Sequence, residues 1–172
     1  MLPARVILML LALWLPPAAA APGLRVVDVV KAGDAASERE HDYEGAGATV
    51  EALDGRTLRQ ARGWLSYSMT VYEDTEVTLA CAFRGSDGKK FVFDLLVEGR
   101  KIVTHTFVSP SPAPVMVEFR IPFEVTKGLT SIHVMLKAAA GPTPGLLELR
   151  TVQEHLERPA DGAPERARAA FW

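Results

Sequence analysis

One stretch, Phe91–Thr106 (FVFDLLVEGRKIVTHT), constrains the fold of this chain more than any other. Its first half places an apolar residue at every second position, and the alternation resumes after Glu98-Gly99. Successive side chains of a strand point to opposite faces, so this pattern predicts half-buried strands rather than a helix. Glycine at the second loop position adopts a positive φ at little cost, which favours a tight hairpin. The stretch therefore predicts the central hairpin of an all-β domain.

Similar alternation recurs along the chain, separated by turn residues and by the proline-rich loops 109–114 and 141–145. The clearest predicted strands are 24–30, 63–71, 77–83, 91–97, 102–106, 115–121, 132–136 and 147–151, with shorter ones on either side of Asp54-Gly55. Segment 31–48 is polar and has no period, which predicts a long surface loop. About eight or nine short antiparallel strands without a helical pattern predict a β-sandwich, and the jelly roll is the favoured version.

The two ends of the chain differ from this predicted domain of residues 24–152. Residues 1–21 combine Arg5, an apolar run and Ala18-Ala19-Ala20, a pattern typical of a signal peptide. We therefore expect export to the periplasm or the extracellular medium, with no membrane attachment after cleavage. Residues 153–172 are polar and lack a strand period, so we expect a disordered or partly helical tail.

Composition excludes several functions. The formal net charge is −2 and no basic block occurs, so nothing predicts a nucleic-acid partner. The single cysteine, Cys81, lies in phase with Leu79 and Phe83, which predicts a buried structural thiol. The 4 histidines are scattered, so no metal site is predicted from them. A structural calcium ion held by Asp34 and Glu38 is the one cofactor we consider, because calcium prefers several oxygen ligands.

Four motifs follow one another along the predicted domain. They are GDAASEREH at 33–41, RQARGWLSY at 59–67, FDLLVEG at 93–99 and GLLELR at 145–150. Together, over roughly residues 26–151, the chain resembles the β-sandwich domain near the C-terminus of bacterial β-L-arabinofuranosidase-type glycoside hydrolases. The resemblance implies a galactose-binding-like jelly roll.

The same resemblance implies no hydrolase activity. Those enzymes carry catalysis on a separate helical barrel, with a glutamate and a zinc-bound cysteine cluster. This chain has 1 cysteine and no room for such a barrel. No nucleophile elbow, phosphate loop or zincin motif occurs either. The resemblance thus implies a secreted, free-standing accessory domain, and specifically a carbohydrate-binding module.

Six residues form the predicted ligand-binding site. Carboxylates, imidazole and guanidinium groups can hydrogen-bond sugar hydroxyls, and aromatic rings offer a surface for the sugar ring. They are Asp34, Glu38, His41, Tyr43, Arg59 and Trp64.

A structural interpretation of the same residues stays open. In it Ser37 caps a short turn, Glu38 pairs with His41 to hold the loop, and Trp64 packs beneath that loop. Asp94, on the central hairpin, is interpreted as structural and needs a partner such as Lys101 or Arg120. The leading hypothesis is a glycan-binding module. The alternative is a structural or protein-interaction domain of the cell envelope, whose protein partner the sequence does not identify.

Overall fold

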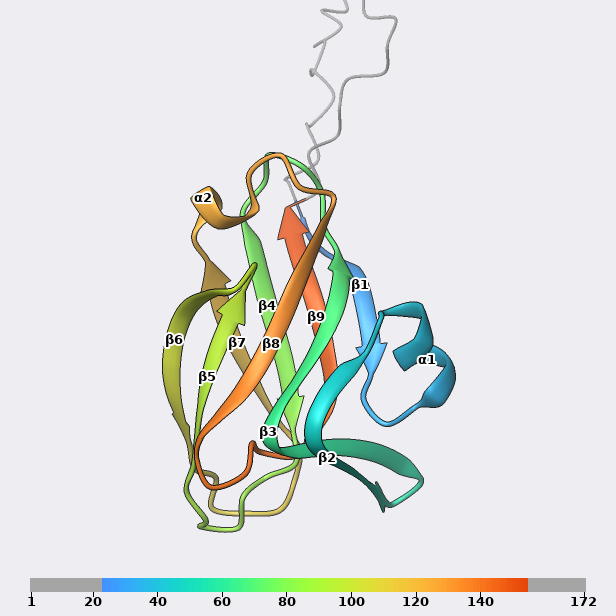
Figure 1. Ribbon diagram of the computed structural model, residues 1–172, viewed down its shortest axis with the longest axis vertical. Helices are drawn as coiled ribbons and strands as arrows, with labels where there is room; N and C mark the ends of the chain where they lie inside the picture. Colours follow the sequence, from blue (N-terminus) through green and yellow to red (C-terminus); the bar gives the residue numbers. More distant parts are fainter. Residues whose placement is uncertain (1–22, 155–172) are drawn as a thin grey trace, which may run out of the picture.

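The protein folds as a β-sandwich, which confirms the predicted fold class (Figure 1). The computed structural model describes residues 23–154, so the predicted signal peptide and most of the predicted tail lie outside the described residues. The strands are β1 (Leu24–Lys31), β2 (Glu44–Leu53), β3 (Arg56–Thr70), β4 (Val77–Phe83), β5 (Phe91–Val97), β6 (Arg100–Phe107), β7 (Val115–Ile121), β8 (Ser131–Ala140) and β9 (Leu146–Glu154), and the helices are α1 (Ala35–Glu40) and α2 (Phe123–Thr126).

The strands form two packed layers. The front sheet has the order β6-β5-β8-β3, with β2 paired to β3, and the back sheet has the order β9-β4-β7, with β1 paired to β9 (Figure 1). Every pairing is antiparallel, and a single pairing between Arg59 and Leu146 joins β3 to β9. The long strand β3 therefore belongs to the front sheet and also connects the two layers.

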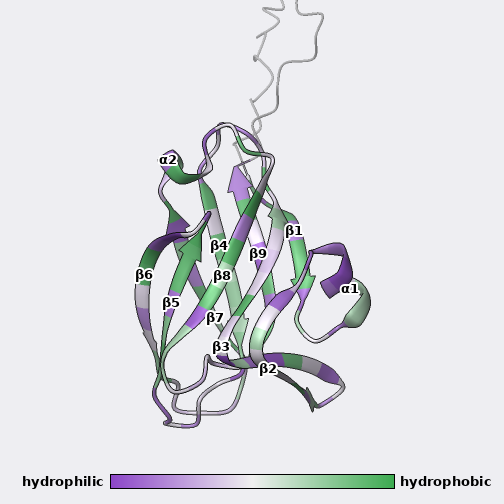
Figure 2. Ribbon diagram, in the orientation of Figure 1, coloured by the Kyte–Doolittle hydropathy of each residue, from purple (hydrophilic) through white to green (hydrophobic). Residues whose placement is uncertain are grey.

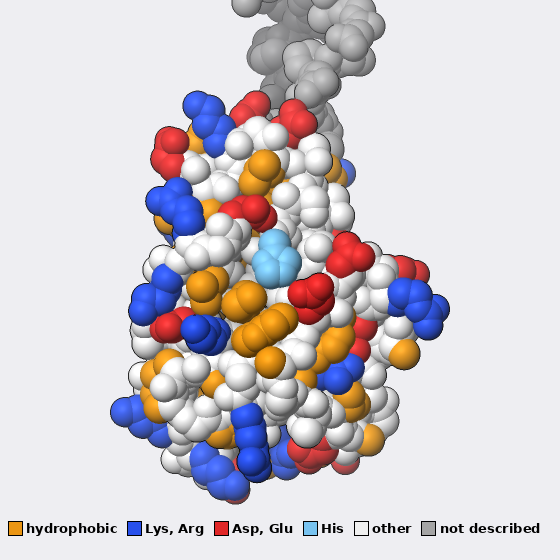
Figure 3. Space-filling view, viewed as in Figure 1, with side chains coloured by type: hydrophobic (Ala, Val, Ile, Leu, Met, Phe, Trp, Pro, Cys, Tyr) orange, Lys and Arg blue, Asp and Glu red, His pale blue; other side chains and the backbone are white. Residues whose placement is uncertain are grey.

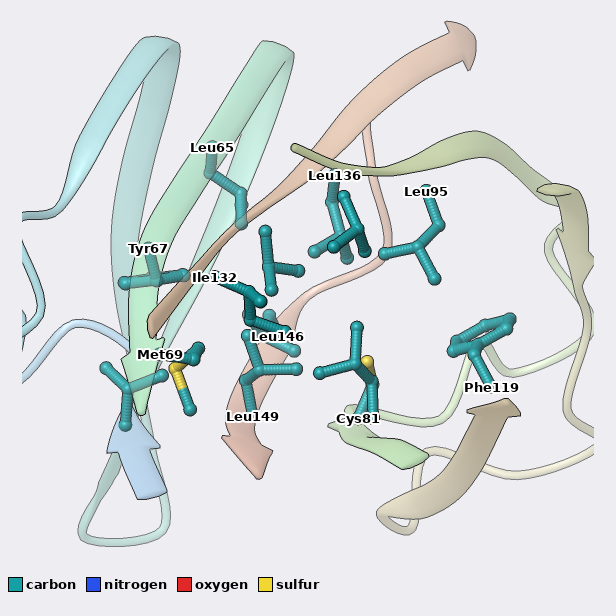
Figure 4. Close-up of a cluster of buried hydrophobic side chains, with 14 of the residues drawn as sticks. Leu65, Tyr67, Met69, Cys81, Leu95, Phe119, Ile132, Leu136, Leu146 and Leu149 are labelled. Atoms are coloured by element: carbon teal, nitrogen blue, oxygen red, sulfur yellow. The ribbon is translucent and has the colours of Figure 1, made fainter. Parts of the chain in front are cut away.

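The core fills the space between the sheets. Leu65, Tyr67 and Met69 of β3 are 0% exposed, as are Leu95 of β5 and Leu149 of β9 (Figure 4). These residues occupy alternate positions, which explains why the periodicity predicted the strands correctly. Figure 2 shows the same division between core and surface. Hydrophobic residues recur along the central strands, whereas α1 is largely hydrophilic.

Cys81 lies inside this core, as predicted. Its side chain is 0% exposed, and burial raises the pKa of the thiol to about 12. A thiol with such a pKa stays protonated at neutral pH and packs as a small apolar group.

The predicted loop at 31–48 is wrong, because α1 and the first part of β2 occupy it. Almost all of β2 is exposed on both faces, so no buried face imposes an alternation on its sequence. A bulge between Ala46 and Ala48, where Gly47 has a φ of +62°, interrupts the pairing with β3 as well. Asp54-Gly55 forms the predicted turn, with both residues at positive φ.

The last strand extends past its predicted end. Gln153, which we expected in the tail, is 0% exposed and belongs to β9. Its amide oxygen accepts a hydrogen bond from the Tyr72 backbone nitrogen at 2.7 Å, and its amide nitrogen donates to the Tyr72 carbonyl at 3.0 Å. A polar side chain that mimics a strand partner in this way gives no apolar signal in the sequence.

Candidate functional site

The helix α1 follows an aspartate cap. The Asp34 carboxylate accepts a hydrogen bond from the Ser37 backbone nitrogen at 2.8 Å, so Asp34 is the cap in place of the expected Ser37. The Ser37 hydroxyl instead accepts a hydrogen bond from the Lys31 backbone nitrogen at 2.9 Å. These contacts fix the start of α1 against the end of β1.

Glu38 points from α1 into the protein and is 5% exposed. Its carboxylate accepts hydrogen bonds from the Gly33 backbone nitrogen at 2.7 Å, from Arg59 Nε at 2.9 Å and from the Tyr67 hydroxyl at 3.2 Å. The Arg59 guanidinium lies 4.3 Å from the centre of the Tyr43 ring, and the Tyr43 and Tyr67 rings lie 5.3 Å apart. We call Glu38, Arg59, Tyr43 and Tyr67 the Glu38 cluster.

Electrostatics agree with the geometry of the Glu38 cluster. The hydrogen bond to Glu38 raises the pKa of Arg59 against the opposing effect of burial. Burial, followed by the negative charge of Glu38, raises the pKa of Tyr67 strongly. The raised pKa values keep the Arg59 guanidinium charged and the two tyrosines neutral beside the Glu38 carboxyl group. The polar atoms of the cluster bond to one another, which is typical of an ion pair that anchors a loop.

His41 does not pair with Glu38, so that part of the structural interpretation is wrong. Its Nδ1 lies 2.6 Å from the Ser37 carbonyl oxygen and its Nε2 lies 3.0 Å from Asp28 Oδ1. Burial lowers the pKa of His41, but the Ser37 carbonyl and the Asp28 carboxylate outweigh it and raise the pKa above 6.5. Asp28 also accepts a hydrogen bond from the Thr70 backbone nitrogen at 2.7 Å. The pair of Asp28 and His41, called the clasp below, thus ties β1 and α1 to β3.

Trp64 lies on the other side of β3. Leu65 and Tyr67 face the core, so the alternation places Trp64 and Ser66 on the outer face of the front sheet. Trp64 is half-buried and stands directly opposite Lys137 of β8 and Ala46 of β2. The six predicted residues therefore do not form one site. Glu38, Arg59 and Tyr43 belong to one cluster, and His41 pairs with Asp28 instead. Asp34 caps the start of α1, and Trp64 lies on the outer face of β3.

The outer face around Trp64 combines apolar and polar side chains. Ser66 stands opposite Met135 on one side and Glu44 on the other. Leu96 lies opposite Met135 in turn, and both are half-buried. Figure 3 shows hydrophobic side chains gathered on this face, with charged groups and a histidine around them. We call this region the Trp64 face.

Asp94 borders the Trp64 face and has the expected partner. Its carboxylate accepts a hydrogen bond from the Thr104 hydroxyl at 2.5 Å and lies 3.5 Å from Lys101 Nζ. The Thr104 hydroxyl, followed by the Lys101 charge, holds the pKa of Asp94 below its ordinary value, although burial opposes the shift. Lys137 stands opposite Asp94 on β8. Alternation along 132–137 could have placed Met135 and Lys137 on an outer face of the sheet. Only the register between β3 and β8 shows that they lie next to Trp64.

Asp34, the sixth predicted residue, lines a groove over the back sheet. The groove has a volume of about 690 Å³. Its lining includes the charged residues Lys31, Arg56 and Arg150 and the apolar residues Pro114–Met116. Arg150 donates to Glu148 in the same groove. Its lining includes no aromatic side chain.

The geometry offers little to a metal ion. Within residues 23–154, no group of three or more histidine, cysteine, aspartate or glutamate side chains could hold one. The carboxylates of the two predicted calcium ligands already have other partners, because Glu38 is bonded to Arg59 and Tyr67, and Asp34 caps α1. Neither helix between residues 23 and 154 is long and apolar enough to cross a membrane.

Solved structures with a similar fold show which fold class the domain belongs to. A family 35 carbohydrate-binding module from an environmental isolate aligns with a TM-score of 0.54 at 12% identity, over 74% of this chain and 96% of that one. The exo-β-1,3-galactanase of Phanerochaete chrysosporium with galactose aligns with a TM-score of 0.53 at 11% identity, over 72% of this chain and 28% of that one. The ANX1 ectodomain of Arabidopsis thaliana aligns with a TM-score of 0.55 at 11% identity, over 78% of this chain and 50% of that one. The domain is thus a jelly-roll β-sandwich of the type found in carbohydrate-binding modules.

The sequence places the chain more narrowly. Residues 24–152 match the family described as "Family of unknown function (DUF6805)", and the chain belongs to that family. No curated protein matches the chain.

Proposed function

We propose that this domain is a non-catalytic carbohydrate-binding module and that it binds its glycan on the Trp64 face. The fold supports the general function, because it is similar to that of modules named for carbohydrate binding. The observation that carries the proposal is the position of Trp64. An indole ring on a sheet face offers an apolar surface for a sugar ring, while Lys137 and Glu44 nearby can hydrogen-bond its hydroxyls.

Two other regions support binding less well. The polar atoms of the Glu38 cluster already bond to one another, so a sugar would have to displace an ion pair. The groove over the back sheet is large enough for a ligand but has no aromatic side chain to stack on a sugar. The Trp64 face therefore gives a sugar both kinds of contact without breaking a buried interaction.

We also propose the setting in which the module acts. The N-terminal pattern of residues 1–21 supports export to the periplasm or the extracellular medium. The resemblance to the accessory domain of β-L-arabinofuranosidase-type hydrolases supports a role in plant-type polysaccharide use. Arabinan and galactan are therefore the first ligands to test.

We expect Trp64→Ala to weaken glycan binding at least tenfold, because the stacking surface is lost. Affinity gels containing debranched arabinan or galactan measure the retardation of wild type and variant. A second readout uses the protein without the predicted signal peptide in a Trp172→Phe background, in which Trp64 is the only one left of the 3 tryptophans in the sequence. There, titration with the retained polysaccharide should shift the Trp64 emission.

The control is Arg56→Ala, which alters the groove over the back sheet and leaves the Trp64 face intact. It should bind like the wild type. If Arg56→Ala lost binding and Trp64→Ala kept it, the glycan would bind in the groove. If the folded wild type bound neither polysaccharide nor any member of a wider glycan array, the proposal would be wrong. The half-buried Leu96 and Met135 would then direct the search to a protein partner.

A further inference from the structure

Ser66 stands out among the buried polar side chains. It is 0% exposed, and its hydroxyl is the sole buried side-chain nitrogen or oxygen atom without a hydrogen-bond partner within residues 23–154. Buried polar groups elsewhere in this domain are bonded, as Glu38, His41 and Gln153 show. An unpaired buried hydroxyl destabilises a folded protein and needs an explanation.

The surroundings of Ser66 indicate what the hydroxyl faces. Ser66 lies on the outer face between Trp64 and Ser68, with Met135 and Glu44 opposite it on the neighbouring strands. It is fully buried although it lies on an outer face, so these larger neighbours cover it. Methionine is unbranched and flexible, and Met135 is half-buried, so its side chain is the easiest of these to move.

We infer that Ser66 is the hydrogen-bonding floor of the sugar site and that Met135 is its movable cover. The inference rests on the proposed function and specifies its ligand. A sugar ring stacked on Trp64 would displace the Met135 side chain and place one hydroxyl against Ser66. The preferred ligand is a sugar unit with a hydroxyl at the ring edge next to its stacked face. A deoxy analogue that lacks this hydroxyl leaves Ser66 unpaired and is rejected.

The decisive variant is Ser66→Ala, because a ligand-binding role and a structural role predict opposite results. If the hydroxyl waits for a ligand, its removal relieves an unpaired buried group and should raise Tm by about 2 to 6 °C. The same variant should bind the retained polysaccharide about tenfold more weakly. The matched control is Ser68→Ala, the same change two residues along the same face, which should alter neither Tm nor affinity.

Met135→Ala tests the cover. Removal of the cover should strengthen binding at least twofold, and Ser66→Ala in the same chain should cancel the gain. A lower Tm for Ser66→Ala, or unchanged affinity in a protein whose binding Trp64→Ala abolishes, would overturn the inference while the proposed function stands. If the wild type binds no glycan at all, the proposed function fails and this inference fails with it.

Discussion

Arg59→Ala is expected to lower the free energy of unfolding by about 3 to 5 kcal/mol, because it leaves a buried charge without its partner. Glu38 is 5% exposed and takes hydrogen bonds from Arg59 on both carboxylate oxygens. The bonds from Gly33 and Tyr67 remain in the variant but do not neutralise the carboxylate. Urea denaturation of wild type and variant at pH 7, followed by circular dichroism, measures the loss.

Two further variants interpret this result. Arg62→Ala, an exposed arginine on the same strand, should change stability by less than about 0.5 kcal/mol. The double variant Glu38→Leu/Arg59→Met should recover most of the loss, because an apolar pair can replace a buried ion pair. If Arg59→Ala cost less than about 1 kcal/mol and still abolished glycan binding, Arg59 would act on the ligand rather than on the fold.

The sequence predicted those parts of the fold that have one buried face. Alternation along Gly63–Val71 and Phe91–Thr106 reflects contact with a single core, so these strands could be identified from spacing alone. Of strand β2, only the end before Asp54-Gly55 was predicted. Its first part could not be identified, because both of its faces are exposed and only its pairing with β3 makes it a strand. Helix α1 could not be predicted either. It has only 6 residues and most are polar, so the sequence shows no helical spacing of apolar residues there.

The candidate site was harder to predict than the fold. The ionisable residues of 34–43 looked suited to binding, but their partners come from distant strands. Glu38 bonds to Arg59 and His41 to Asp28, and neither pairing leaves a mark in the spacing of the sequence. The Trp64 face likewise depends on the register between β3 and β8, which no local pattern fixes.

The clasp should make the domain less stable as the pH rises through and above neutrality. Both ring nitrogens of His41 face oxygen acceptors, and only the imidazolium can donate from both. Folding therefore favours the protonated form, in agreement with the raised pKa of His41. The contribution of protonated His41 to the free energy of unfolding is complete below pH 6.5, the pKa of histidine in the unfolded chain. It is lost as the pH rises through the higher pKa of His41 in the folded protein.

The comparison of wild type with His41→Gln isolates this effect. Burial lowers the pKa of His105, which gives the opposite dependence, but both proteins carry His105 and its contribution cancels in the difference. The stability difference between the two proteins, from urea denaturation at pH 5 to 9, should be largest at pH 5 to 6 and shrink above neutrality. The Asp28 carboxylate determines the lowest pH at which the clasp still stabilises the domain. Burial opposes the shift, but hydrogen bonds from Thr70 and His41 hold its pKa below 3.8, so its contribution is lost only as the pH falls through that lower value. A difference that stayed constant with pH would mean that His41 is neutral in the folded protein and that the clasp is held without its charge.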